Sequence, residues 1–74
     1  MEYIRVKLSK EPPAETIPVM IDGENNGIVG NVIEIDDGTY DITADTPGAE
    51  LKEVTIEYGG STVEEPQEVL INVT

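Results

Sequence analysis

Residues 3–8 read YIRVKL, and every second side chain in this stretch is apolar: Ile4, Val6 and Leu8. Successive side chains of a β-strand point to opposite sides, so this alternation predicts a strand with one buried face. The pattern recurs along the chain, and clusters of Gly, Pro, Asn and Asp separate the repeats and favour turns. The further segments with apolar residues at alternate positions are residues 17–21, 28–35, 39–45, 54–58 and 69–73.

This spacing of strands and turns predicts an all-β protein. No stretch keeps apolar residues at positions i, i+3, i+4 and i+7 for two turns, so we expect almost no helix. Six to seven short antiparallel strands are typical of a small β-sandwich of the immunoglobulin-like (Ig-like) or prealbumin-like kind. The length of 74 residues suits one such domain, 1–74.

The connection at residues 11–15 is expected to be extended, because its two prolines cannot donate to a sheet ladder. The core should consist of aliphatic side chains, since the chain has no Phe and no Trp. The side chains expected to be buried occupy alternate positions of the predicted strands: Ile4, Val6, Leu8, Val19, Ile21, Ile33, Ile35, Ile42, Val54, Ile56, Ile71 and Val73.

The chain is strongly acidic, with sixteen Asp and Glu against four Lys and Arg and a net charge of −12. The first ten residues carry a net charge of +2, so the remainder carries −14. Nucleic acid and anionic membranes attract clustered Lys and Arg, so we expect neither nucleic-acid binding nor membrane insertion. The partner expected is an unidentified protein, and a basic surface on it would suit this charge. We also expect added salt to stabilise the fold at neutral pH.

The sequence offers little for catalysis, and we expect that the protein is not an enzyme. It has no Cys and no His, so Ser-His-Asp and Cys-His arrangements cannot be built. No cofactor is expected, apart from weak calcium binding at one loop. The chain has no apolar run long enough for a signal peptide or a spanning helix. Its location stays open, and it would be extracellular or virion-associated if it is part of a larger protein.

The loop at residues 22–27 has a spacing that suits calcium. Asp22, Glu24 and Asn26 place side-chain oxygens at positions 1, 3 and 5 of a calcium-binding loop, and Gly27 stands at position 6. Ile33 occupies position 12, where a bidentate Glu belongs, so we expect an affinity of roughly millimolar at best. The alternative is structural, because a hairpin turn uses the same residue types to adopt positive φ.

The three tyrosines also allow two interpretations. Tyr3, Tyr40 and Tyr58 could stack on a sugar, because aromatic faces suit carbohydrate rings. Tyr40 and Tyr58, however, share the parity of the inward residues in their predicted strands. We therefore expect these two side chains in the core or at its boundary, with the hydroxyl in contact with water.

Several short motifs occur in a fixed order between about residue 17 and residue 56: Val19-Met20-Ile21-Asp22-Gly23, then Gly27, DGTYDIT at residues 37–43, Pro47-Gly48 and Val54-Thr55-Ile56. This order resembles the PEGA-type repeat, a small β-sandwich module of bacterial and archaeal surface and multidomain proteins. The family usually continues its first hairpin with a Gly, Thr, Pro sequence, whereas this chain reads Gly30-Asn31-Val32. The resemblance implies a non-catalytic module for spacing, adhesion or partner display, and it implies no particular site residue.

The leading hypothesis is a non-catalytic structural or interaction module that serves as a spacer, display or docking domain of a surface protein or an assembly. Two alternatives stay open. One is a small calcium- or ligand-binding domain that uses the loop from Asp22 to Gly27. The other is an acidic cytosolic protein that binds a basic partner.

Overall fold

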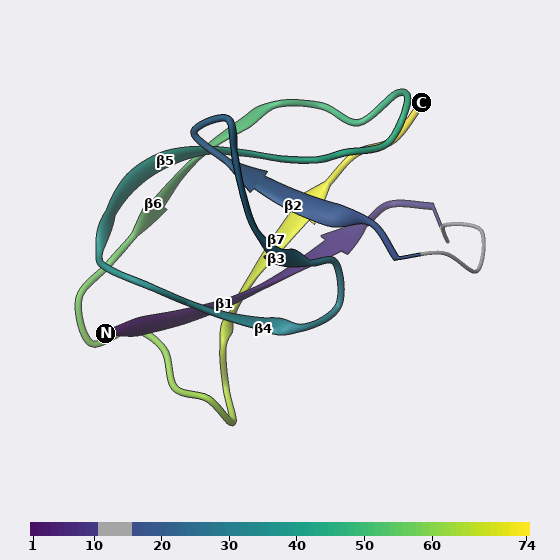
Figure 1. The fold of residues 1–74 in the computed structure, drawn as a ribbon. Helices are drawn as coiled ribbons and strands as arrows, with labels where there is room; N and C mark the ends of the chain where they lie inside the picture. The colour runs from purple at the N-terminus through teal and green to yellow at the C-terminus, as the bar shows by residue number, and fades with distance from the viewer. Residues whose placement is uncertain (11–15) are drawn as a thin grey trace.

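The computed structural model describes residues 1–10 and 16–74, and it consists of strands arranged in two sheets (Figure 1). β4, β1 and β7 form a three-stranded sheet in that order, and β3, β2, β5 and β6 form a four-stranded sheet. This arrangement confirms the predicted all-β sandwich. The strands in chain order are β1 (Glu2–Leu8), β2 (Pro18–Ile21), β3 (Glu24–Ile28), β4 (Val32–Ile35), β5 (Gly38–Ala44), β6 (Lys52–Ile56) and β7 (Gln67–Ile71).

Two further predictions concern the connection at residues 11–15 and the absence of membrane-spanning helices. The proline-containing connection predicted at residues 11–15 lies outside the described residues. Within residues 1–10 and 16–74, no helix is long and apolar enough to cross a membrane.

The four-stranded sheet is antiparallel throughout. β2 pairs with both β3 and β5, and β5 pairs with β6 from Gly38 opposite Ile56 to Ile42 opposite Lys52. Short turns suffice to connect antiparallel neighbours, and the turn-forming residues predicted from the sequence serve that purpose between β2 and β3.

The three-stranded sheet departs from the prediction in one pairing. β1 pairs antiparallel with β4 but parallel with β7. The expectation of antiparallel strands throughout is therefore wrong for this pair. Parallel neighbours cannot be joined by a hairpin, and here all the elements from β2 to β6 lie between them in the chain.

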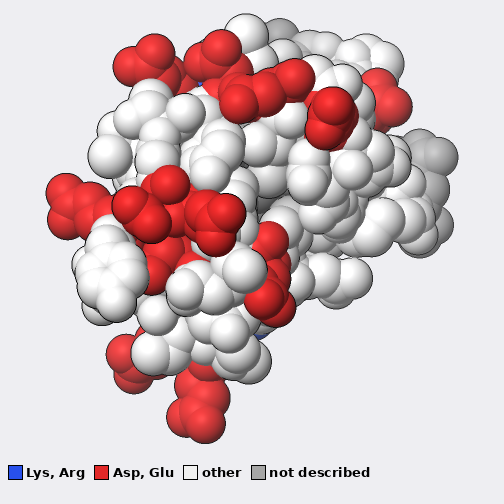
Figure 2. All heavy atoms as spheres, turned by 60° about the vertical axis from the view of Figure 1, so that its left-hand side comes forward, with Lys and Arg blue, Asp and Glu red and all other residues white. Residues whose placement is uncertain are grey.

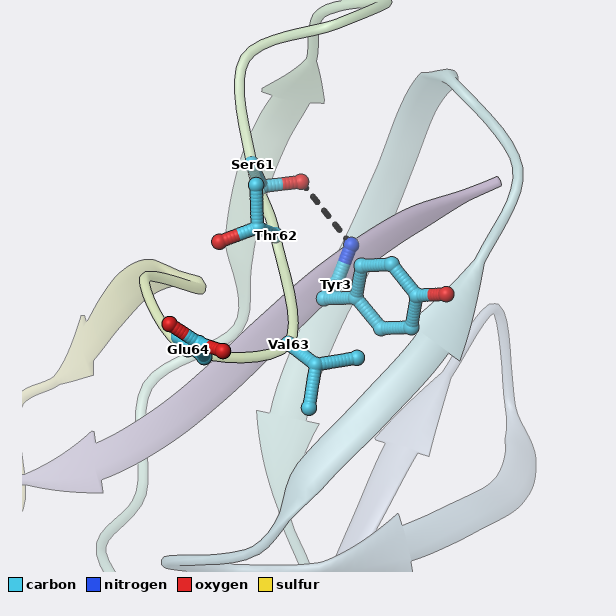
Figure 3. A pocket seen from close by; sticks show the side chains of 5 residues that line it. All are labelled: Tyr3, Ser61, Thr62, Val63 and Glu64. Carbon is cyan, nitrogen blue, oxygen red and sulfur yellow. Dashed lines mark hydrogen bonds between the residues drawn. The ribbon is translucent and has the colours of Figure 1, made fainter.

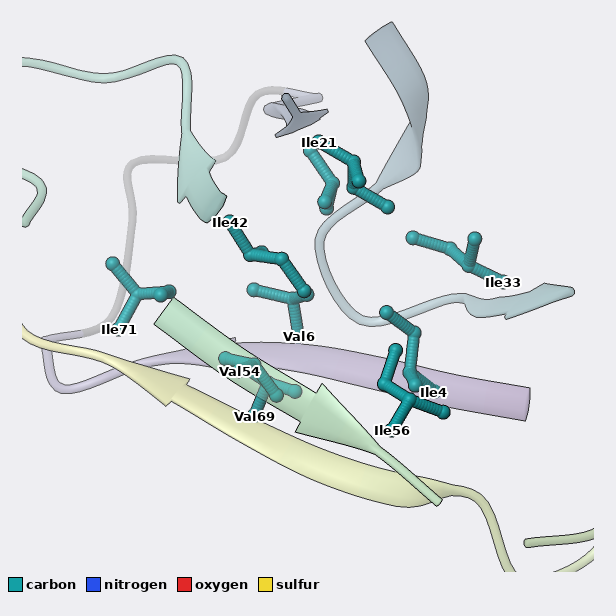
Figure 4. Close-up of a cluster of buried hydrophobic side chains, with 10 residues drawn as sticks. Ile4, Val6, Ile21, Ile33, Ile42, Val54, Ile56, Val69 and Ile71 are labelled. Carbon is teal, nitrogen blue, oxygen red and sulfur yellow. The ribbon is translucent and has the colours of Figure 1, made fainter. Parts of the chain in front are cut away.

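The core lies between the two sheets and is aliphatic, as predicted (Figure 4). Ile4 and Val6 point from β1 towards side chains of the four-stranded sheet such as Ile42. The predicted core residues that are buried are Ile4, Val6, Val19, Ile21, Ile33, Ile42, Val54, Ile56 and Ile71.

The observed core differs from the predicted one at the ends of the strands. Leu8, Ile35 and Val73 are only partly buried, because Leu8 and Ile35 end their strands and Val73 lies beyond the end of β7. Among the residues that the structure describes, four others are buried in addition to the predicted ones: Glu2, Ile17, Ala44 and Val69.

Candidate functional site

The predicted calcium loop is mostly strand. Asp22 and Gly23 alone form the turn between β2 and β3, with φ of 50° and 83°. Two consecutive residues with positive φ are the signature of a type I′ hairpin, for which Asp-Gly is a favoured sequence. The loop expected to extend to Gly27 is therefore shorter than predicted, and Glu24 and Asn26 belong to β3.

Two of the predicted calcium ligands, Asp22 and Asn26, form side-chain hydrogen bonds to the backbone. Asp22 Oδ1 accepts a hydrogen bond from Asp41 N–H at 2.8 Å, which fastens the hairpin to β5. Asn26 Nδ2 donates to Glu24 O at 3.0 Å. Within residues 1–10 and 16–74, no three acidic side chains gather in a way that could hold a metal ion. Calcium binding by Asp22, Glu24 and Asn26 stays a prediction.

A shallow hollow lies beside the start of β1, where the loop between β6 and β7 passes close to that strand (Figure 3). Its volume is about 470 Å³, and Tyr3 and Val63 supply its apolar surface. Tyr3 N–H donates to Ser61 Oγ at 2.9 Å and holds the loop against the strand. The remaining lining residues are Thr62 and Glu64.

Under this loop lies the buried carboxylate of Glu2, which is only 3% exposed. Its two oxygens accept hydrogen bonds from Gly59 N–H at 3.0 Å and from Ser61 Oγ at 2.8 Å. The hydrogen bond from Gly59, followed by that from Ser61, lowers the pKa of Glu2 below its ordinary value. Glu2 therefore connects the first residues of β1 to the loop between β6 and β7.

The role of Glu2 was missed at the level of sequence, although a signal for it was present. Glu2 shares the inward parity of Ile4 and Val6 in β1, so alternation alone places its side chain on the buried face. Its partners, Gly59 and Ser61, are far away in the chain, and only the fold brings them together.

The tyrosines differ in how far their side chains are buried. Tyr40 is partly buried against the core, as predicted, and its hydroxyl donates to Asp36 O at 2.9 Å. Tyr58 is 83% exposed, so the prediction that it lies in the core or at its boundary is wrong. β6 ends at Ile56, and the chain turns through residues 57–60, so the alternation of the strand no longer applies at Tyr58.

Charge is distributed unevenly over the surface. The side of the molecule that carries β5 and β6 shows many acidic side chains and almost no basic ones (Figure 2). Asp41 lies directly opposite Glu53 on these strands, and both are exposed. On the three-stranded sheet, Lys7 Nζ forms an ion pair with Glu68 at 2.7 Å, and this contact lowers the pKa of the Glu68 carboxyl.

Side-chain hydrogen bonds connect β6 and β7, which are edge strands of the two sheets. Lys52 Nζ reaches from β6 to Leu70 O on β7 at 3.0 Å, and Gln67 Nε2 reaches from β7 to Thr55 O on β6 at 3.3 Å. An uncovered strand edge offers its backbone groups to other chains, and these two contacts occupy carbonyl groups that would otherwise be free on that side.

Comparison with known proteins adds no relative to this description. No family model, no curated protein and no solved structure matches the chain.

Proposed function

We propose that this protein is a non-catalytic module that spaces or displays other parts of a larger assembly. The observation that carries the proposal is the parallel pairing of the first and last strands. Because β1 and β7 run in the same direction, the chain begins at one end of this pair and leaves at the other. Met1 and Thr74 accordingly lie at opposite ends of the molecule (Figure 1).

This path of the chain suits a spacer. The molecule is elongated, with extents of 33 × 22 × 18 Å. A domain with its two termini at opposite ends holds the segments attached to those termini apart. A domain with adjacent termini would instead bring the attached segments together. The resemblance to the PEGA-type repeat over about residues 17–56 supports the same proposal, because that family consists of non-catalytic modules.

The experiment is X-ray scattering from one, two and four copies of the sequence joined head to tail. We expect the maximum dimension to increase with each copy by a length approaching the 33 Å long axis. Four copies that fold individually but form a particle no longer than two copies would contradict the spacer function. Thermal unfolding of each sample establishes that every copy is folded.

A second candidate function is the docking of a basic protein segment. The acidic side that carries β5 and β6 favours it, since opposite charge steers association. The test is binding of a lysine-rich peptide at low and high salt, compared with an uncharged peptide of equal length. We expect binding that weakens with salt and is reduced in an Asp41→Asn, Glu53→Gln variant. Equal retention of both peptides would contradict this function.

A further inference from the structure

The first and last strands share a continuous contact, which we term the terminal seam: β1 and β7 with the residues that extend their pairing. It contains five register pairs, from Ile4 opposite Gln67 to Leu8 opposite Ile71. Ser9 N–H donates to Ile71 O at 3.0 Å, and Val73 N–H donates to Ser9 Oγ at 2.8 Å. Hydrogen bonding between the two strands therefore continues past the end of β1.

The direction of the two strands decides how tension would act on the terminal seam. A pull on Met1 draws β1 towards its start, and a pull on Thr74 draws β7 towards its end. Because the strands are parallel, these opposite forces slide one strand along the other. The hydrogen bonds of a parallel pair are evenly spaced, so they share this load. A pull on both strands from the same end would instead break the bonds one after another.

The outer ends of both strands are also fastened to the rest of the fold. At the start of β1, the Glu2 carboxylate accepts hydrogen bonds from Gly59 and Ser61. After the end of β7, Val73 forms a bridge with Ala49, and Thr74 N–H donates to Gly48 O at 3.1 Å. These contacts oppose fraying at the two points where tension would be applied.

From this geometry we propose that the protein bears tensile load, and that the terminal seam is the element that resists it. This inference rests on the proposed function as a spacer, because only a module connected at both ends is stretched between them. The force needed to unfold the protein would depend on the direction of the pull. An end-to-end pull loads all the hydrogen bonds of the seam in shear, whereas a pull from one end of the seam breaks them one after another.

The test is single-molecule stretching through engineered cysteines, which label cleanly because the chain contains no Cys. A variant with Met1→Cys and Thr74→Cys is pulled from end to end. The matched control, with Met1→Cys and Glu65→Cys, is pulled from two points near the same end of the terminal seam, since Glu65 lies just before β7. Equal melting temperatures establish that the two proteins have the same stability.

We expect the end-to-end rupture force to be several-fold higher than the force in the control geometry. Forced unfolding is governed by the unfolding rate, so two proteins of equal stability can differ in this measurement. Adding Ser9→Ala removes the acceptor of the Val73 N–H bond, and it should lower the rupture force only in the end-to-end geometry.

Equal rupture forces in the two geometries would overturn the load-bearing role, and so would an end-to-end force below that of the control. Either result leaves the spacer proposal intact if head-to-tail copies form an extended particle in X-ray scattering. A compact particle together with a high end-to-end rupture force would instead contradict the spacer function, while still showing that the terminal seam resists shear.

Discussion

The two sheets of this sandwich are assembled from different kinds of sequence neighbours. In the four-stranded sheet, β2 and β3 follow each other in the chain, and so do β5 and β6. In the three-stranded sheet, β1 lies between β4 and β7, and neither partner is next to it in sequence. Local turn chemistry can therefore specify much of the first sheet, whereas the second depends on contacts that form only when the whole chain has folded.

The sheets also differ in the charges on their outer faces. β1 presents Lys7, which is paired with Glu68 on the neighbouring strand. β5 presents Asp41 directly opposite Glu53, a pair of like charges. Opposite charges across strands stabilise a sheet and like charges destabilise it, so the outer faces should respond to salt in opposite ways.

The largest effect should come from the core that the sheets share. Ile4→Ala in the three-stranded sheet and Ile42→Ala in the four-stranded sheet each remove a fully buried side chain. We expect each to lower the free energy of unfolding by about 2–4 kcal/mol, measured by denaturant unfolding. Leu51→Ala, at a side chain that is 67% exposed, is the control and should change it by less than about 0.5 kcal/mol. Separate transitions for the two sheets would contradict a shared core.

The next effect concerns the place where the chain passes from one sheet to the other. Gly27 has a φ of 148°, and a Cβ atom there would lie 2.8 Å from Cγ1 of Ile33, in the other sheet. Gly27→Ala should therefore destabilise the fold by about 1–3 kcal/mol, through backbone strain and displacement of Ile33. Gly30→Ala is the control, because Gly30 also has a positive φ but a Cβ added there would have no atom within 4 Å. Thermal melts in which Gly30→Ala is the more harmful variant would show that the close approach is unimportant.

The next prediction concerns pH and depends on Glu2, which lies at the start of β1 in the three-stranded sheet. Because hydrogen bonds lower the pKa of Glu2 in the folded state, its ionised form stabilises the fold. That stability is complete above the ordinary value of 4.5 and is lost as the pH falls through the lowered folded value. Glu2→Gln should therefore lower the melting temperature at pH 7, and the difference from the unmodified protein should shrink below pH 4.5.

The control for this experiment is Glu64→Gln, which removes the same charge from an exposed position in the neighbouring loop. We expect it to leave the melting temperature at pH 7 nearly unchanged. A Glu2→Gln protein whose deficit stays constant from pH 7 to pH 3 would show that the hydrogen bonds to Gly59 and Ser61 do not depend on the charge.

The smallest effects should come from the outer faces. Asp41→Asn should stabilise the protein by about 0.2–1 kcal/mol at low salt, because it removes repulsion from Glu53. Lys7→Met should destabilise it by at most about 1 kcal/mol, because both side chains of the ion pair are half exposed. Both differences should diminish in high sodium chloride, and they should diminish from opposite signs.

The same melts test the net charge of the whole protein. With far more acids than bases, the melting temperature of the unmodified protein should rise with sodium chloride. A fall would show that ion pairs such as Lys7 with Glu68 outweigh the repulsion. Calcium chloride at matched ionic strength separates screening from binding, and a rise seen only with calcium would support a metal site at Asp22.

The sequence by itself determined most of the strands, most of the buried side chains and the Asp22-Gly23 turn. Each of these depends on residues close together in the chain: alternation in residues 3–8, or the tolerance of Asp-Gly for positive φ. The sequence did not predict β3, which occupies residues expected to form a loop and ends within the segment 28–35 that was expected to be one strand. Alternation fails where a strand ends, which is why Tyr58 is exposed although it has the parity of Ile56. The loop around Asp22 could be located from sequence, but its partner Asp41 could not.

Only the tertiary structure decided which distant strands pair and in which direction. The parallel contact of β1 with β7 and the bonds from Gly59 and Ser61 to Glu2 join opposite ends of the chain. No local pattern encodes such pairs, because several strands of similar length and parity could occupy the same place beside β1. The choice among them depends on the packing of both sheets around one core, which is a property of the complete fold.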